Sequence, residues 1–179
     1  MYVYCLFCEA GKSKYVARFA EILYGCRTLA PKQIQHTWSG GQMIDRKRDL
    51  LPGYIFLFTE EKIPNPASLT KMQDVIRCLR DSSQRYELGG NDEQFALMLL
   101  RKDGVIGKTP VYQEGDRIRI REGAFAGLET RILKVERRAS RMLVEIPFAG
   151  QAVRTWLEYE IVENLETENQ NPEEIITEG

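Results

Sequence analysis

The periodicity of the sequence changes near residue 111, and this change limits the folds open to the chain. Before it, strand-like runs are interrupted by two stretches with helical spacing; after it, only short strand-like runs occur, separated by turns rich in glycine and charge. We therefore predict an α+β domain over residues 1–102, a linker over 103–110 and a small β-barrel over 111–162.

In the first part, residues 2–8 and 54–59 are β-branched and aromatic runs and are predicted to be strands. Residues 12–24 carry apolar residues at helical spacing, which predicts an amphipathic helix with one apolar stripe formed by Val16, Phe19, Ala20 and Leu23. Further expected elements are a hairpin that reverses at 39–41 and returns over 42–50, a short helix at 67–73, strands at 75–79 and 85–88, and a helix opened by a capping box of Asn91 and Gln94 and ending near Lys102. This order fits an antiparallel sheet flanked by helices.

In the second part, four strands are expected, over residues 116–120, 128–135, 142–146 and 152–157. Residues 163–179 contain six acids and no base and cannot bury a core, so we predict a disordered acidic tail that is dispensable for folding. The net charge of −1 hides a split between +5 for residues 1–162 and −6 for this tail.

Several functional classes lack their usual signatures. No apolar run approaches 18 residues and the N-terminus is no signal peptide, so a cytoplasmic protein without a membrane segment is expected. His36 is the single histidine, and the phosphate- and dinucleotide-binding glycine motifs and the serine-hydrolase motif are missing, so we expect no enzyme, cofactor or metal. Cys5 and Cys8 lie at i and i+3 of a strand, so their thiols should point to opposite faces. A thiol enzyme using either cysteine stays open as an alternative.

The predicted strands at 2–8 and 54–59 are apolar on both faces. A sheet with helices on one face needs only one apolar face, so the surplus predicts an exposed hydrophobic patch, and such patches usually mark a partner site. The alternative is that these residues belong to an ordinary core.

Basic residues gather in two places. Arg46, Lys47 and Arg48 lie on the return arm of the hairpin, where they can hold a nucleic-acid backbone without reading its sequence, or simply be solvated. The barrel carries further cations between its acids, and these are candidates for binding structured RNA through phosphates. They are Arg117, Arg119, Arg121, Arg131, Lys134, Arg137, Arg138 and Arg141.

Two motifs, together with the order and size of the two domains, resemble those of the NusG/Spt5 family of transcription elongation factors. Residues 50–57, L-L-P-G-Y-I-F-L, are similar to the family's L-F-P-G-Y-V-F-V segment. Residues 115–120, G-D-R-I-R-I, followed by G-A-F-A-G at 123–127, are similar to the KOW signature. Thr130 replaces a glycine of the housekeeping members, and residues 78–83 replace their G-F-V-G-like stretch. The first strand looks more like specialised antitermination paralogues such as RfaH and LoaP.

The resemblance implies an NGN-like N-terminal domain, a KOW domain with an SH3-like barrel, and a monomeric factor that promotes processive transcription. It implies that the clamp helices of RNA polymerase bind Phe7, Leu51, Tyr54 and Phe56, and that an RNA hairpin or non-template DNA is a second partner. A ribosomal protein is another candidate partner, through the segment around Phe148. A general housekeeping factor and a KOW-containing ribosomal or RNA-chaperone protein remain alternatives.

Overall fold

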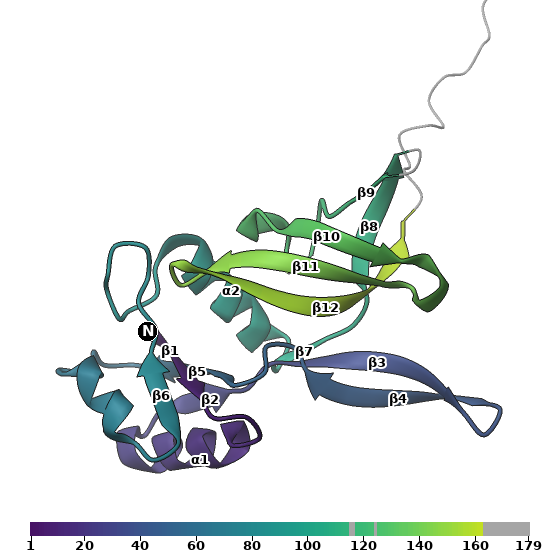
Figure 1. Cartoon of the computed structure of the whole chain (residues 1–179). Helices are drawn as coiled ribbons and strands as arrows, with labels where there is room; N and C mark the ends of the chain where they lie inside the picture. Colours follow the sequence, from purple (N-terminus) through teal and green to yellow (C-terminus); the bar gives the residue numbers. More distant parts are fainter. Residues whose placement is uncertain (115–116, 124, 163–179) are drawn as a thin grey trace, which may run out of the picture.

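The N-terminal part is built on a four-stranded antiparallel sheet in the order β2-β5-β1-β6 (Figure 1). The computed structural model describes residues 1–114, 117–123 and 125–162. The strands of this sheet are β1 (Tyr2–Cys8), β2 (Arg27–Leu29), β5 (Tyr54–Thr59) and β6 (Val75–Cys78). The predicted strands at 2–8 and 54–59 are confirmed, and they are the two central strands, which explains why both are apolar on both faces.

One face of this sheet is covered by α1 (Ser13–Tyr24) and the short 3-10 helix η1 (Pro66–Lys71). Gly25 ends α1 in the left-handed conformation, with φ of 57°. Of the predicted apolar stripe, only Val16 and Ala20 are buried, whereas Phe19 and Leu23 are exposed. The buried stripe of this helix is narrow because it is formed by the small residues Ser13, Val16 and Ala20. The side chains that flank this stripe do not pack against the sheet.

The expected hairpin is present as β3 (Lys32–Ser39) and β4 (Gln42–Asp49). Gly40 and Gly41 form its two-residue turn, and both have positive φ (60° and 81°). The turn type that best matches the twist of two paired strands requires positive φ at both positions. The strand β7 (Val105–Ile106) pairs in parallel with β3, giving a separate sheet in the order β4-β3-β7. Residues 103–110, expected to be a linker, therefore include strand structure.

The helix α2 (Gly90–Arg101) lies on the other face of the four-stranded sheet (Figure 1). The predicted capping box is wrong, because Gly89 is the N-cap residue and no side chain caps the helix. The predicted strand at 85–88 is also wrong. Asp81 accepts hydrogen bonds from the amides of Ser83 (2.8 Å) and Arg85 (2.9 Å) and from the Arg85 guanidinium (2.7 Å), which curls this segment into turns.

This loop should make stability depend on pH through Asp81. Burial alone would raise the pKa of Asp81, but the hydrogen bonds from Arg85 and Ser83 lower it below its ordinary value. A carboxyl with a lowered folded-state pKa stabilises the fold above its unfolded pKa, and that stabilisation is lost as pH falls through the folded pKa. Asp81→Asn should therefore destabilise the chain at pH 7 and flatten the fall in stability below about pH 4, the ordinary aspartate range. Urea denaturation across pH 2–7 measures this, and an unchanged acid profile would contradict it.

The C-terminal part is a five-stranded sheet in the order β10-β11-β12-β8-β9 (Figure 1). Because β9 and β10 are the ends of this order, the described residues form a barrel that is not fully closed by hydrogen bonds. Short 3-10 turns, η2 (Ala126–Leu128) and η3 (Arg137–Ala139), flank β10. The strands are β8 (Thr109–Glu114), β9 (Arg117–Arg119), β10 (Arg131–Glu136), β11 (Arg141–Phe148) and β12 (Gln151–Ile161).

All four strands predicted for this part exist with shifted ends, and β8 is an addition. It pairs in parallel with the end of β12, so its partner lies about 50 residues away (Thr109↔Tyr159). That pairing could not be anticipated from local pattern. The fold is thus α+β, as predicted, with an antiparallel N-terminal sheet, helices and a C-terminal barrel-like sheet. The predicted disordered tail, 163–179, lies outside the described residues.

Candidate functional site

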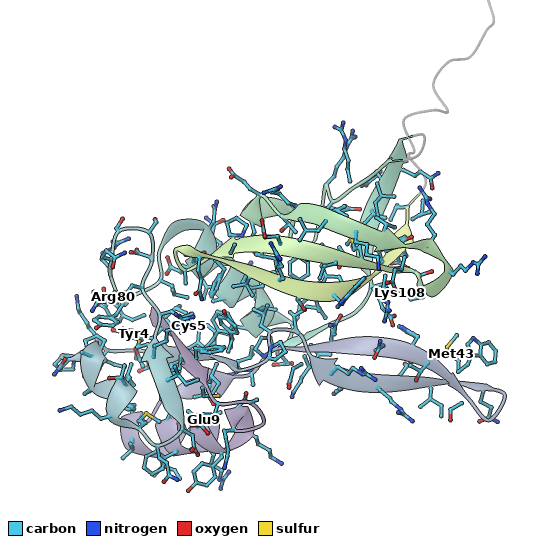
Figure 2. All side chains as sticks on the ribbon, viewed as in Figure 1. Tyr4, Cys5, Glu9, Met43, Arg80 and Lys108 are labelled. Carbon is cyan, nitrogen blue, oxygen red and sulfur yellow. The ribbon has the colours of Figure 1, made fainter. Side chains whose placement is uncertain are left out.

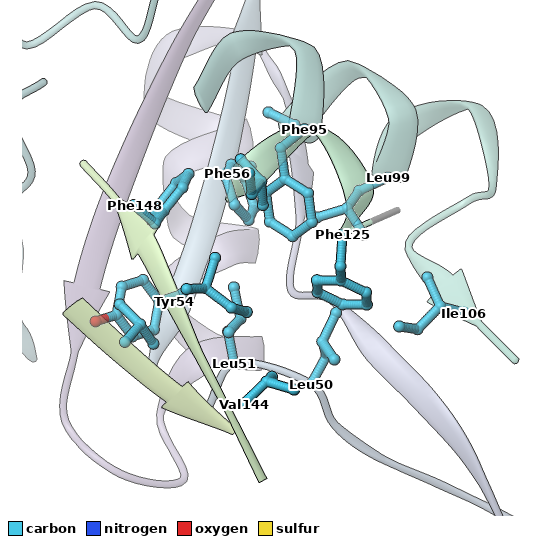
Figure 3. Packing of buried hydrophobic residues seen from close by; sticks show 14 of the residues in the cluster. Leu50, Leu51, Tyr54, Phe56, Phe95, Leu99, Ile106, Phe125, Val144 and Phe148 are labelled. Carbon is cyan, nitrogen blue, oxygen red and sulfur yellow. The ribbon is translucent and has the colours of Figure 1, made fainter. Parts of the chain in front are cut away.

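The four residues assigned by resemblance to polymerase binding meet on one face of the four-stranded sheet. Phe7 on β1 pairs in register with Tyr54 on β5, and their ring centroids lie 5.0 Å apart. Leu51, just before β5, and Phe56 belong to the same apolar cluster (Figure 3). The antiparallel register therefore assembles residues that are distant in sequence into one aromatic surface, which we call the β1–β5 face.

The β1–β5 face is covered by the barrel. Phe148, at the end of β11, is 2% exposed, and its ring centroid lies 6.3 Å from that of Tyr54 and 5.6 Å from that of Phe56. Phe95 of α2 packs edge-on against the rings of Phe56 (6.2 Å) and Phe148 (5.8 Å), and Phe125 of the barrel approaches Phe95 at 5.7 Å (Figure 3). One hydrophobic core thus continues from the sheet through α2 into the barrel.

The prediction of an exposed hydrophobic patch is therefore wrong for this conformation. Tyr54 is only 8% exposed, Leu51 and Phe56 are buried, and Phe7 is half-buried beneath the Arg77 guanidinium, 5.3 Å from the ring centroid. The sheet does carry surplus apolar residues, but the barrel of the same chain covers them. Burial also raises the pKa of Tyr54.

Polar contacts surround this apolar centre and fix the position of the barrel. Thr155 Oγ1 donates to the carbonyl of Leu50 (2.6 Å), and Gln151 Nε2 donates to the Tyr54 hydroxyl (3.1 Å). At the start of α2, Asp92 accepts a hydrogen bond from the amide of Ala149 (3.1 Å), and burial raises the pKa of this carboxyl. The docked arrangement thus satisfies buried polar groups as well as apolar ones.

Gly53 shapes the turn that presents the β1–β5 face. Its φ is +85°, and a Cβ placed there would lie 2.9 Å from the carbonyl oxygen of Cys8 and 2.9 Å from Cε2 of Phe7. Its own carbonyl accepts a hydrogen bond from the amide of Cys8 (2.9 Å). The P-G-Y segment therefore requires glycine so that the chain can pass close to β1 and orient Leu51 and Tyr54 toward the same cluster.

The hairpin cations are separate from the β1–β5 face. Arg46, Lys47 and Arg48 are exposed on β4, with Arg46 and Arg48 on one face of the strand and Lys47 on the other. The hairpin itself is joined to the barrel, because Glu158 accepts a hydrogen bond from the backbone amide of His36 (2.9 Å) and lies 2.7 Å from its Nδ1.

Three of the predicted barrel cations form ion pairs with acids. Glu136 lies 3.0 Å from Lys134 and 2.5 Å from Arg141, and these two cations lower its pKa. Arg131 pairs with Glu145 at 3.4 Å. Other candidates lie on the surface, and the side chain of Arg117 is outside the described part. The exposed candidates are Arg119, Arg121, Arg131, Lys134, Arg137 and Arg138.

The cysteines are buried. Cys5 packs in the cluster shared with the barrel and Cys8 in the cluster beneath α1, so the predicted divergence of the two thiols is confirmed. Burial raises the pKa of Cys5 well above its ordinary value and that of Cys78 to about 12, which opposes formation of a reactive thiolate. Across residues 1–114, 117–123 and 125–162, no group of three or more potential ligands is arranged to hold a metal ion. In the same ranges, no helix is both long and apolar enough to cross a bilayer.

Two aromatic residues occupy positions that the sequence does not predict, the buried Phe148 and the exposed Trp38. The resemblance implies a docking point for a ribosomal protein around Phe148, whereas in the structure this residue lies at the centre of the contact between barrel and sheet. Its one signal was an aromatic residue next to a turn, in P-F-A-G. Trp38 lies at the end of β3, is 72% exposed and faces solvent in this conformation.

No protein-family model matches the chain, and no curated protein matches it. Among solved structures, one described as "Domain interaction in Thermotoga maritima NusG" is similar, with a TM-score of 0.49 and 16% sequence identity, over 88% of this chain and 93% of that chain. So low a similarity decides nothing about family or function, which have to be read from this chain's own residues.

Proposed function

We propose that this chain is a non-enzymatic transcription elongation factor of the NusG type that binds RNA polymerase through the β1–β5 face. One observation carries the proposal: Phe7, Leu51, Tyr54 and Phe56, singled out by the resemblance, form one aromatic surface that is covered by the barrel. Because the cover comes from a separate part of the chain, residues 111–162, it can be exchanged for a partner without dismantling the four-stranded sheet.

Polymerase binding at this face requires the barrel to leave. The clamp helices of the polymerase would replace Phe148 against Tyr54 and Phe56, and the hydrogen bonds from Gln151 and Thr155 would be given up. Docked and released forms are then two populations, and a partner that binds only the released form shifts the balance toward it. Binding across the clamp would favour the closed polymerase and so shorten pauses.

The more specific role that we propose for the chain is that of a specialised antitermination factor, which acts in the cytoplasm as a monomer. A barrel released from the sheet stays tethered and can bind a second partner at high effective concentration. An RNA hairpin bound through the barrel cations is one such partner, and competition from Glu136 and Glu145 would make that binding weak unless several phosphates are contacted. A housekeeping factor that docks a ribosomal protein through Phe148 would need the same release first.

Two other classes fit less well. A ribosomal or RNA-chaperone protein would have no use for an aromatic face beneath its barrel. A thiol enzyme would need an accessible, acidic thiol, whereas Cys5 is fully buried and its pKa is raised.

Purified RNA polymerase transcribing a template with known pause sites tests the proposal. The full chain is expected to shorten the pauses, and Tyr54→Ala should remove most of this effect because truncating a central interface aromatic weakens binding by about 2 kcal/mol or more. Tyr15→Ala is the matched control, since Tyr15 is exposed on α1, away from the β1–β5 face. No effect of the wild-type chain on elongation, or full activity of Tyr54→Ala, would contradict the proposal.

A further inference from the structure

The outer strand of the β3–β4 hairpin carries three successive cations, Arg46, Lys47 and Arg48, which we call the β4 cations. All three are exposed, and the hairpin extends from the body of the molecule, with Met43 toward its free end (Figures 1 and 2). The strand β4 is an edge of its sheet, so the long side chains of these residues reach solvent along this edge.

Within the described part of the chain, the β4 cations have no acidic partner. Over residues 1–114, 117–123 and 125–162, no ion pair joins any of the three to a carboxylate. The two acids that flank them on the same strand are engaged elsewhere, Asp45 with His36 (3.5 Å) and Asp49 with Lys32. The positive charge of β4 is therefore available to an acidic segment from outside the hairpin.

The end of the same chain supplies such a segment. Residues 163–179, which lie outside the described residues, contain six glutamates and no base. This tail carries −6 and residues 1–162 carry +5, so the two parts attract each other. Several barrel cations already pair with acids, among them Arg131, Lys134 and Arg141, which leaves the β4 cations as a better target for the tail.

The tail begins close to the hairpin. Gln33 Nε2 on β3 donates to the carbonyl of Trp156 (2.8 Å), and Glu158 accepts a hydrogen bond from the amide of His36 (2.9 Å), so β12 passes beside the hairpin. The described residues end at Val162, shortly after Glu158. The 17 residues of the tail span about 56 Å when fully extended, which is far more than the width of a two-stranded hairpin.

We propose that the acidic tail, residues 163–179, binds the β4 cations of the same chain. Its glutamates lie near Arg46 and Arg48 on one face of β4 and near Lys47 on the other. Each exposed ion pair is weak, but the tether gives the tail a high effective concentration at the hairpin, so a few pairs are enough. A polyanion that approaches β4 must first displace the tail, which therefore screens this edge from ligands that bind by charge alone.

A spin label at the end of the tail tests this contact in the full chain, and the test is independent of the proposed function because it needs no polymerase. The four native cysteines are buried, so a nitroxide can be attached to Gly179→Cys alone. The amide NMR signals of residues 46–48 should lose intensity at low salt. They should recover at about 1 M salt, where the Debye length falls to about 3 Å.

Charge variants show whether the β4 cations cause this loss. Arg46→Gln with Arg48→Gln should restore the signal of Lys47. Lys14→Gln with Arg18→Gln is the matched control, because these cations are exposed on α1 and the change in charge is the same, so here the loss should remain. Full intensity at residues 46–48 in the labelled wild type, or a loss that persists without Arg46 and Arg48, would overturn the inference.

Heparin, a polyanion without base sequence, gives a second readout. Neutralising the tail should tighten heparin binding about fivefold, the combined effect of three exposed ion pairs. With Arg46→Gln and Arg48→Gln present, this gain should fall below about twofold, the share left to Lys47. With Lys14→Gln and Arg18→Gln it should stay about fivefold. An equal gain in both backgrounds would mean that the tail acts only through net charge, and would contradict binding at β4. The tail substitutions are Glu163→Gln, Glu166→Gln, Glu168→Gln, Glu173→Gln, Glu174→Gln and Glu178→Gln.

Discussion

Phe148→Ala is expected to lower the free energy of unfolding by about 3–5 kcal/mol, the usual loss for removing a buried phenylalanine ring. The ring is packed among Tyr54, Phe56 and Phe95, and those three residues lie on two different elements that cannot close the gap by a small shift. Much of the loss should appear as weaker docking of the barrel on the β1–β5 face. Urea denaturation monitored by far-UV circular dichroism measures it.

Leu133→Ala is the control for this substitution, because Leu133 lies in the same barrel and is exposed. Its effect should stay within about 0.5 kcal/mol, as is usual for surface positions. A loss of under about 1 kcal/mol for Phe148→Ala would mean that the ring lacks the packing described here.

Gly53→Ala should destabilise the chain by about 2 kcal/mol or more. The left-handed backbone conformation alone costs a residue with a Cβ about 1–2 kcal/mol, and at +85° this glycine is in that region. The new Cβ would also press on the carbonyl oxygen of Cys8, which is backbone and cannot rotate away. Since the clash falls at the junction of β1 and β5, polymerase binding should weaken together with stability.

Gly107→Ala provides the comparison, because a Cβ at Gly107 would meet nothing within 4 Å and its backbone needs no positive φ. Its free energy of unfolding should change by less than about 1 kcal/mol, which leaves the thermal midpoint close to that of the wild type. Equal effects of the two substitutions would show that Gly53 is not constrained by the close approach to β1.

Features fixed by local chemistry were predictable from the sequence. The Gly40–Gly41 turn, the central strands β1 and β5 and the end of α1 at Gly25 each follow from residues within a few positions. The face alternation that separates Cys5 from Cys8 was likewise predictable, because a strand has a period of two.

Features that depend on contacts between distant segments were not predictable from the sequence. The first half of the strand β8, from Thr109 to Val111, pairs with β12, which returns beside it about 50 residues later. Residues 85–88 have strand-like composition, but Asp81 draws this segment into turns. Burial of the β1–β5 face depends on Phe148, which lies about 90 residues after Tyr54. No local sequence pattern indicates a contact between residues so far apart in the chain.

The measurement that tests the central claim most directly is the affinity of purified RNA polymerase for the wild-type chain, Phe148→Ala and the double variant Tyr54→Ala/Phe148→Ala. If the β1–β5 face binds the polymerase and the barrel covers it, Phe148→Ala should bind more tightly than the wild type. Adding Tyr54→Ala should then weaken binding by about 30-fold, corresponding to loss of a central interface aromatic. If Phe148→Ala binds no better than the wild type and the double variant binds equally well, the polymerase does not use this face.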